Sequence, residues 1–269
     1  MIPADKTPWF ETWLDRHARA RLRRAFARVH VLGLEHLRAA LDAGPVLVIS
    51  NHTAWWDALV ILWLGRLVLR ADGYALMDAR NLRRLPFFRK VGAFGVELDD
   101  RGDRTRAVRH AARLLDRAGR LVWVFPQGRE RPVSARPLGF APGAAAIARL
   151  ARGCRVVPAA LRYEHGGEPA PVAYVSFGEP LPREADAARA VAAQEHAVER
   201  LHDDLDARLA SGDDARAGVT LLRQPASRVG ALLERLLARW AALGSGALLE
   251  PPARSHREGP AAPDQRAGR

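Results

Sequence analysis

The chain has 269 residues, of which 48% are hydrophobic, and it carries a formal net charge of +12 at pH 7. This composition suffices for a hydrophobic core and excludes a disordered protein. The single cysteine, Cys154, excludes an intramolecular disulfide and a C-x-x-C metal site. The positive charge favours an acidic partner such as an anionic bilayer or nucleic acid, although arginines on solvated faces explain it equally well.

Residues 8–26 predict a basic amphipathic helix that begins with Trp9, Phe10, Trp13 and Leu14. Aromatic side chains beside clustered arginines suit a helix at a membrane interface. Packing of the same apolar stripe on the domain is an equally good interpretation. No run of residues approaches the roughly 20 apolar residues that a transmembrane helix needs, and residues 1–6 lack the features of a signal peptide.

The next residues lead to the most informative stretch of the sequence. Residues 29–32 predict a strand followed by a turn, and residues 39–42 a short helix that ends at Gly44 and Pro45. Residues 46–49 then predict a buried strand, and the apolar run 58–64 predicts a helix. The two polar residues His52 and Asp57 therefore lie where a strand turns into a helix.

His52 and Asp57 form a candidate general base. On one regular helix, side chains five residues apart point about 140° away from each other, so these two can meet only across a turn. The Asp57 carboxylate would then accept from one ring nitrogen of His52, and the other nitrogen would remove a proton from a substrate hydroxyl. The sequence has no G-x-S-x-G nucleophile, which fits direct attack by that hydroxyl. A metal site at this pair lacks a third ligand at plausible spacing.

The middle of the chain predicts a second strand at 73–77, a basic and aromatic connection at 81–90, and a helix at 104–118 with Asp103 as its cap. Residues 121–125 predict a further strand that runs into a turn with Gly128, where backbone N–H groups could approach an oxyanion or a phosphate. A helix at 144–151 and strands at 155–163 and 172–177 follow.

The C-terminal part predicts helices and a tail. Residues 184–210 read as a solvated helix rich in alanine and charges, and residues 219–249 as an amphipathic helix that packs on the core, on a partner or on a bilayer. Residues 251–269, rich in proline, glycine, alanine and arginine, predict a disordered tail. The alternation of strands and helices predicts an α/β protein.

Four ordered stretches resemble the glycerolipid acyltransferase family, of the lysophosphatidic acid acyltransferase type. The family's blocks are N-H-x4-D, a glycine-and-arginine block, F-P-E-G-T-R and a V-P block. They correspond here to Asn51 to Asp57, to residues 92–104, to the stretch that begins Phe125-Pro126-Gln127-Gly128, and to Val157-Pro158. The resemblance covers roughly residues 41–182. It implies a single domain with a central mixed, mostly parallel sheet flanked by helices, here with amphipathic N- and C-terminal helices.

The resemblance also implies roles for particular residues. His52 and Asp57 would be catalytic, and N–H groups near Gly128 would stabilise the oxyanion. The arginine of the second block, which helps to hold the acceptor's phosphate, corresponds best to Arg101, with Arg129 as a second phosphate ligand; Leu98 takes its place in the other alignment of the block. Gln127 replaces a glutamate and Arg129 a threonine, so acceptor specificity could differ. Because a proline is disfavoured inside a central strand, Pro158 is expected at a bulge or a free edge, where it would shape the cleft wall.

We therefore expect an O-acyltransferase that moves a fatty acyl group from acyl-CoA or acyl-carrier protein to a lysophospholipid such as 1-acylglycerol-3-phosphate. It would use no metal and no cofactor, and would act in the cytoplasm, peripherally on the inner face of the cell membrane. The alternatives are a non-phosphate acceptor such as a glycolipid or glycosylated pigment, or a basic membrane- or nucleic-acid-binding protein. No nucleic-acid-binding signature is evident. The expected division is 1–40 (lead-in), 41–182 (acyltransferase core), 183–250 (C-terminal helices) and 251–269 (tail).

Overall fold

The structure, a computed structural model, describes residues 1–213 and 218–224. Its centre is a sheet whose eight strands in this part of the chain follow the order β4-β3-β5-β2-β6-β7-β1-β8. Their bounds are β1 Arg28–Leu32, β2 Val46–Ser50, β3 Asp72–Asp78, β4 Ala93–Val96, β5 Arg120–Val124, β6 Arg155–Glu164, β7 Val172–Phe177 and β8 Val219–Arg223.

Most neighbouring strands run parallel. The run β4-β3-β5-β2-β6 is parallel throughout, and β1 is parallel to β7. Antiparallel pairing occurs between β6 and β7 and between β1 and β8. The expected α/β fold with a mixed, mostly parallel sheet is therefore confirmed. Because β5, β2 and β6 are parallel neighbours, their carboxyl ends meet at one edge of the sheet, where ligands bind in open α/β sheets.

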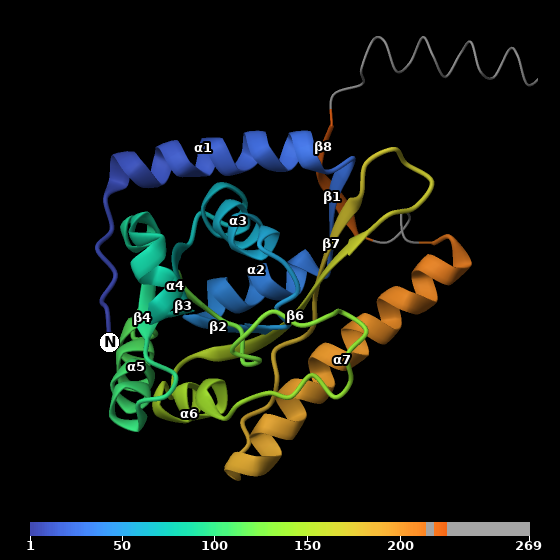
Figure 1. The fold of residues 1–269 in the computed structure, drawn as a ribbon. Coiled ribbons are helices and arrows are strands. Elements are labelled where there is room, and N and C mark those ends of the chain that lie inside the picture. The colour runs from blue at the N-terminus through green and yellow to red at the C-terminus, as the bar shows by residue number, and fades with distance from the viewer. Residues whose placement is uncertain (214–217, 225–269) are drawn as a thin grey trace, which may run out of the picture. The chain divides into compact units, whose positions relative to one another are not determined.

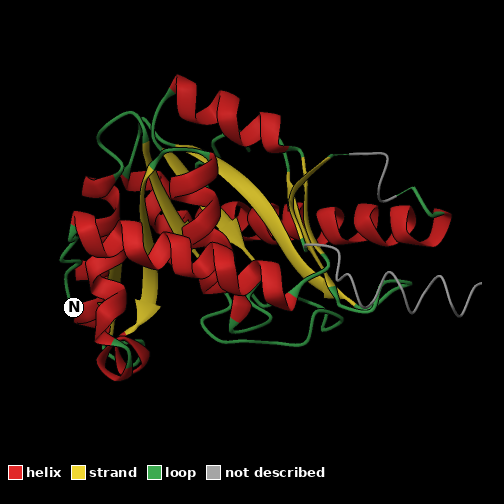
Figure 2. Cartoon of the chain, turned by 90° about the horizontal axis from the view of Figure 1, so that it is seen from above, coloured by secondary structure: helices red, strands yellow, loops and turns green. Residues whose placement is uncertain are grey.

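Helices cover both faces of the sheet (Figures 1 and 2). One face packs against α1 Pro8–Ala25, α2 Leu34–Ala43 and α3 Trp56–Trp63, and the other against α5 Arg101–Leu114, α6 Gly143–Leu150 and α7 Ala187–Ser211. Strand β2 shows why both faces are covered: Val46 and Val48 join the first core, and Leu47 and Ile49 the second. A strand buried on both faces has no polar alternation, which explains the continuous apolar run in the sequence.

Short helical segments connect the remaining strands. The π-helix η1 Leu64–Val68 continues α3, and α4 Ala79–Arg84 is followed by the 3-10 helix η2 Pro86–Val91. These segments replace the irregular connection expected at 81–90. Helix α2 likewise begins at Leu34, where a turn was expected, and β4 was not predicted at all.

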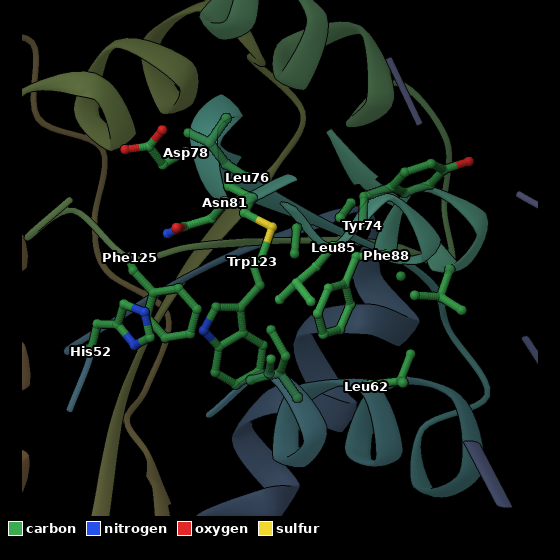
Figure 3. Close-up of a pocket in the computed structure, with 18 of the residues that line it drawn as sticks. His52, Leu62, Tyr74, Leu76, Asp78, Asn81, Leu85, Phe88, Trp123 and Phe125 are labelled. Atoms are coloured by element: carbon green, nitrogen blue, oxygen red, sulfur yellow. The ribbon is translucent and has the colours of Figure 1, made fainter. Parts of the chain in front are cut away.

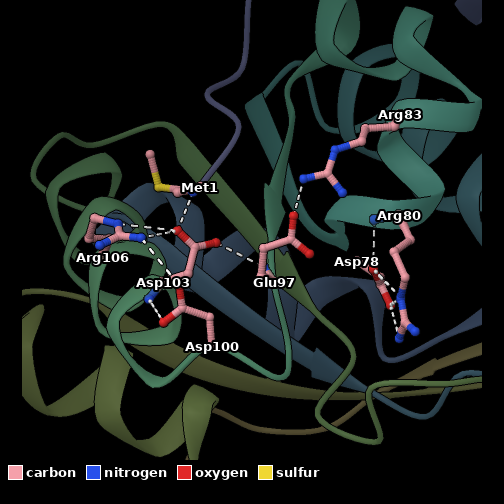
Figure 4. Close-up of polar contacts among 8 residues, drawn as sticks. All are labelled: Met1, Asp78, Arg80, Arg83, Glu97, Asp100, Asp103 and Arg106. Carbon is pink, nitrogen blue, oxygen red and sulfur yellow. Dashed lines mark hydrogen bonds and ion pairs between the residues drawn. The ribbon is translucent and has the colours of Figure 1, made fainter.

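The cap of α5 differs from the prediction. Its N-cap is Asp100, whose carboxylate accepts hydrogen bonds from the Gly102 N–H (2.7 Å) and the Asp103 N–H (3.1 Å). Asp103 is instead buried, accepts from the Glu97 N–H (2.8 Å) and pairs with Arg106 (Figure 4). Two aspartates three residues apart offer the same sequence signal for a cap, and the tertiary contact at Glu97 decides between them.

The C-terminal predictions are only partly tested. Helix α7 matches the helix expected at 184–210, but Val219–Arg223 forms strand β8 instead of the start of a helix. The remainder of the helix expected at 219–249 and the tail 251–269 lie outside the described residues. Residues Met1–Gln224 form one compact unit, and the finer division at 40, 182 and 250 stays a prediction. Among the described residues, no helix is long and apolar enough to cross a membrane.

Candidate active site

The His52 and Asp57 side chains meet across the turn between β2 and α3. The distance between His52 Nδ1 and Asp57 Oδ2 is 2.6 Å. Asp57 is buried in the first turn of α3, whereas the His52 side chain is 25% exposed. Since Nδ1 faces an acceptor-only carboxylate, it carries a proton, and Nε2 of the neutral ring is left as a base.

Backbone and side-chain donors surround the Asp57 carboxylate. Oδ2 also accepts from the N–H groups of Thr53 (2.8 Å) and Ala54 (3.1 Å). Oδ1 accepts from the Tyr163 hydroxyl on β6 at 2.5 Å. These donors compensate for the burial of a charged group, which is costly when it is unpaired.

Asn51 fixes this turn against β6. Its side-chain amide donates to the Leu161 carbonyl oxygen (2.9 Å), and its Oδ1 accepts from the Leu161 N–H (2.8 Å). The side chain thus continues the pairing between β2 and β6 after the backbone ladder ends at Ser50. This places Tyr163, two residues further along β6, beside Asp57.

The turn after β5 forms the other wall of the site. The Phe125 ring stacks on His52, with centroids 4.5 Å apart. Gln127 is not part of the cavity wall described below: its Oε1 accepts from the His52 backbone N–H at 2.6 Å, and its Nε2 donates to the Leu138 carbonyl. The Arg131 N–H donates to the His52 carbonyl oxygen (2.9 Å). These contacts position the histidine backbone from both sides.

Gly128 adopts a φ of 67°, in the region that favours glycine. Its own N–H donates to the Phe125 carbonyl oxygen at 3.1 Å, so it is already used within the turn. The next N–H groups along the turn are those of Arg129 and Glu130, and both residues line the cavity described below. Oxyanion donors from this turn would therefore come from these two residues instead of from Gly128 itself.

An apolar cavity of about 820 Å³ opens at His52 (Figure 3). His52 and Phe125 lie at one end of it, and Tyr74 and Phe88 lie toward the other. Its wall comes from α3, β3, the segment η2 and β5, and includes Leu62, Leu76, Leu85, Phe88, Trp123 and Phe125. Its volume lies within the range of about 300–1,000 Å³ that is typical of ligand sites.

A cluster of ion pairs lines the end of the cavity that is formed by α1 and η1. Lys6 Nζ lies 3.2 Å from Glu11 Oε1, and Arg66 Nη1 lies 3.1 Å from Glu11 Oε2. Arg66 Nε also lies 2.6 Å from Oδ2 of the buried Asp15. The cavity therefore offers a base at one end and a charged boundary at the other.

The predicted phosphate ligands are not all at the site. Arg129 lines the cavity, but Arg101 is an exposed residue at the start of α5 and is not part of the cavity wall. Within the second block it is Leu98 that lines the cavity. Two arginines of α4 form ion pairs: Arg80 pairs with Asp78 and Arg83 with Glu97 (Figure 4).

Pro158 lies within β6, aligned with Ile49 of β2, and is not part of the cavity wall. The ladder between β6 and β7 ends at Ala159, the residue after Pro158. The Pro158 carbonyl oxygen still accepts a hydrogen bond from the Gly178 N–H at 3.0 Å. The proline thus lies where regular pairing with β7 stops.

Sequence reasoning missed Tyr163, Asn51 and Glu130. Glu130 Oε1 lies 4.0 Å from His52 Nε2, and Glu130 occupies the sixth position of the third block, which is arginine in F-P-E-G-T-R. That departure is visible in the sequence and could have been found. The contact from Tyr163 to Asp57 spans 106 residues, and no local pattern indicates it.

Comparison with known proteins gives one family. Residues 28–162, just over half of the chain, match the family model described as Acyltransferase. No curated protein matches the sequence. Among solved structures, that of the 1-acyl-sn-glycerophosphate (LPA) acyltransferase PlsC from Thermotoga maritima is similar, with a TM-score of 0.49 and 19% sequence identity, over 71% of this chain and 79% of that chain. The match to the family model shows that this chain belongs to the acyltransferase family and is an enzyme that transfers acyl groups.

Proposed function

We propose that the enzyme transfers a fatty acyl group from acyl-CoA or acyl-carrier protein to a hydroxyl of a lysophospholipid such as 1-acylglycerol-3-phosphate. One observation carries the proposal: the His52–Asp57 pair, 2.6 Å apart, lies at the opening of a long apolar cavity. A base next to a cavity of this chemistry suits a reaction between a hydroxyl and a carbonyl that carries a hydrocarbon chain.

In this mechanism, His52 Nε2 takes the proton of the acceptor hydroxyl while Asp57 holds the ring at Nδ1. The acceptor oxygen attacks the thioester carbonyl, and the negative charge on the carbonyl oxygen is stabilised by the Arg129 and Glu130 N–H groups. The tetrahedral intermediate collapses, the carbon–sulfur bond breaks, and the thiol leaves with the proton returned by His52. No cofactor takes part in these steps.

The donor's hydrocarbon chain would lie in the apolar cavity. Burial of each methylene group there contributes about 0.8 kcal/mol to binding. The thioester carbonyl would then lie near His52, which lines one end of the cavity with the Phe125 ring stacked on it.

A second candidate acceptor is a lipid with a hydroxyl-rich, uncharged or cationic headgroup. Glu130, 4.0 Å from His52 Nε2, favours it, since a carboxylate beside the base repels a phosphate and accepts hydrogen bonds from hydroxyl or ammonium groups. Leu98 in the wall of the cavity supplies no positive charge either. For the phosphate acceptor, Arg129 is the predicted ligand that lines the cavity, and Arg101 would have to act from outside its wall.

Helix α1 supports action at a membrane surface. Trp9 and Trp13 are 70% and 53% exposed, and Arg16 and Arg24 continue the same exposed stripe. Aromatic and basic side chains on one face of a helix favour binding to an anionic lipid interface. We propose that the enzyme binds peripherally to the inner face of the cell membrane through this stripe.

The test is acyl transfer from labelled acyl-CoA and acyl-carrier protein to a panel of lysophospholipids and glycolipids. We expect His52→Ala to lose at least about a hundredfold in rate, because general-base catalysis contributes that much or more. His36→Ala, on α2, is the matched control and should retain wild-type activity. Retention of activity in folded His52→Ala would remove His52 from the mechanism.

The choice of acceptor is tested by charge reversal. If Glu130 disfavours phosphate, Glu130→Arg should raise the ratio of transfer to lysophosphatidic acid over transfer to a glycolipid about tenfold or more, a shift of about 1.4 kcal/mol. Glu35→Arg, at an exposed position of α2, controls for net charge. An unchanged ratio in Glu130→Arg would reject the role of Glu130 in acceptor choice.

A further inference from the structure

The Asp57 carboxylate is held at both oxygens, from different parts of the fold. Oδ2 binds His52 Nδ1 and two N–H groups of its own turn. Oδ1 accepts from the Tyr163 hydroxyl at 2.5 Å, a distance typical of a hydrogen bond to a charged oxygen. The first set is local and fixes the position of Oδ2, whereas the second defines the plane of the carboxylate.

Tyr163 is itself held in one orientation. Its backbone pairs with Ala173 of β7, and its ring stacks on Phe26 with centroids 5.4 Å apart and an interplanar angle of 27°. Phe26 in turn packs edge-on against Trp56, the residue before Asp57, at 5.1 Å. The aromatic packing leaves the hydroxyl directed at Oδ1.

The hydroxyl keeps its proton. Burial, and then the neighbouring Asp57 carboxylate, raise the pKa of Tyr163 well above its ordinary value. Tyr163 therefore stays protonated at neutral pH and donates to Asp57.

We propose that Tyr163 is a positioning residue of the active site, which orients the Asp57 carboxylate and through it the His52 ring. Without the hydroxyl, Oδ1 is buried without this donor and the carboxylate can rotate about its Cβ–Cγ bond. The His52 ring, which follows Oδ2, would then point Nε2 at the cavity for only part of the time. The inference rests on the proposed role of His52 as the base.

The test is Tyr163→Phe, which removes the hydroxyl and keeps the ring on Phe26. We expect kcat to fall about ten- to hundredfold, as is typical when the partner that orients a catalytic group is lost, with KM within about twofold of wild type. Tyr174→Phe is the matched control, because its hydroxyl contacts Arg28, away from the site, and its kcat should be unchanged. If Tyr163→Phe retains wild-type kcat, or behaves as Tyr174→Phe does, the proposal is overturned.

A second readout does not depend on the substrate. In ¹⁵N-histidine spectra, assigned with His52→Ala, wild-type His52 should show the tautomer protonated at Nδ1, with a strongly hydrogen-bonded proton. Tyr163→Phe should weaken that signal or mix the tautomers, and an unchanged spectrum would contradict the proposal. If the spectrum responds but wild-type enzyme transfers no acyl group, the positioning role stands and the proposed reaction fails.

Should Tyr163→Phe not fold, Phe26→Leu tests the same point. It keeps the hydroxyl but removes the ring stack that directs it, so kcat should fall severalfold with KM retained. An unchanged kcat in Phe26→Leu would count against the proposal.

Discussion

Gly65 offers a direct way to shorten the cavity proposed for the acyl chain. It lies buried in η1 and lines the cavity, and a Cβ atom built on it would meet Leu121 Cδ2 at 3.7 Å, an ordinary van der Waals contact. Its φ is not among the positive values in the chain, so the backbone accepts a side chain there. The Cβ atom of a side chain at residue 65 therefore fits without a backbone shift, and Gly65→Leu would add a branched hydrocarbon at the cavity wall.

The size of the effect follows from the hydrocarbon displaced. A buried methylene group is worth about 0.8 kcal/mol, which corresponds to about fourfold in kcat/KM. The four carbons of a leucine side chain displace a similar number of chain carbons. For donors long enough to reach Gly65, the loss in kcat/KM should thus approach about 3 kcal/mol, or roughly two-hundredfold, and shorter donors should be unaffected.

The assay is competition among saturated acyl-CoA donors of increasing chain length, with transfer products separated by mass. Gly65→Ala, which adds only the Cβ atom, should change the profile little. Gly153→Leu, at a position where a Cβ would meet nothing within 4 Å, controls for the added apolar surface. An equal loss at every chain length in folded Gly65→Leu would show that the acyl chain does not run along η1.

Two further predictions concern the surface and the core. Replacing Trp9 and Trp13 together with alanine should weaken sedimentation with anionic phospholipid vesicles at least tenfold and leave transfer to a detergent-dispersed acceptor unchanged, and undiminished vesicle binding would contradict a role for α1 in membrane binding. Burial and then Arg136 and Arg162 lower the pKa of His202 from 6.5 to about 4. The folded state therefore disfavours protonation of His202. The contribution of this residue to the free energy of unfolding is undiminished above pH 6.5, and roughly 3 kcal/mol of it is lost as the pH falls to 4. Burial raises the pKa of Asp15 from 3.8 to about 6. Between these two pH values, protonation of Asp15 stabilises the folded state as the pH falls, which partly offsets the effect of His202. Urea unfolding of His202→Leu should show a smaller loss of stability between pH 7 and pH 5 than wild type does, and an equal loss would assign the acid sensitivity to other groups.

The strongly patterned parts of the fold could be predicted from the sequence. The apolar run at β2 and the polar turn after it gave both the strand and the meeting of His52 with Asp57, because the two residues are five positions apart and the turn dictates their contact.

Other features depend on tertiary contacts that leave no local pattern. Strand β4 is only four residues long and includes Gly95, which is poorly suited to a strand. Strand β8 is paired with β1 on one side, and its residues Val219–Arg223 have no alternation that distinguishes a strand from a helix start. Gln127 was expected to bind substrate, and its side chain accepts a hydrogen bond from the His52 backbone N–H, a contact between two turns that the sequence does not indicate. Arg101 lies at the start of α5 and outside the cavity wall. The spacing of residues in the sequence does not predict the direction in which this helix runs.

The hydrogen bonds between Asn51 and Leu161 connect residues 110 positions apart. During synthesis His52 and Asp57 leave the ribosome together, but β6 is made much later. Contacts between residues so far apart in the sequence form late in folding. A nascent chain that ends before residue 161 would contain His52 and Asp57 but would lack the hydrogen bonds from β6 that fix the turn between them. If His52 and Asp57 catalyse transfer as proposed, the site would become complete only after β6 has paired with β2.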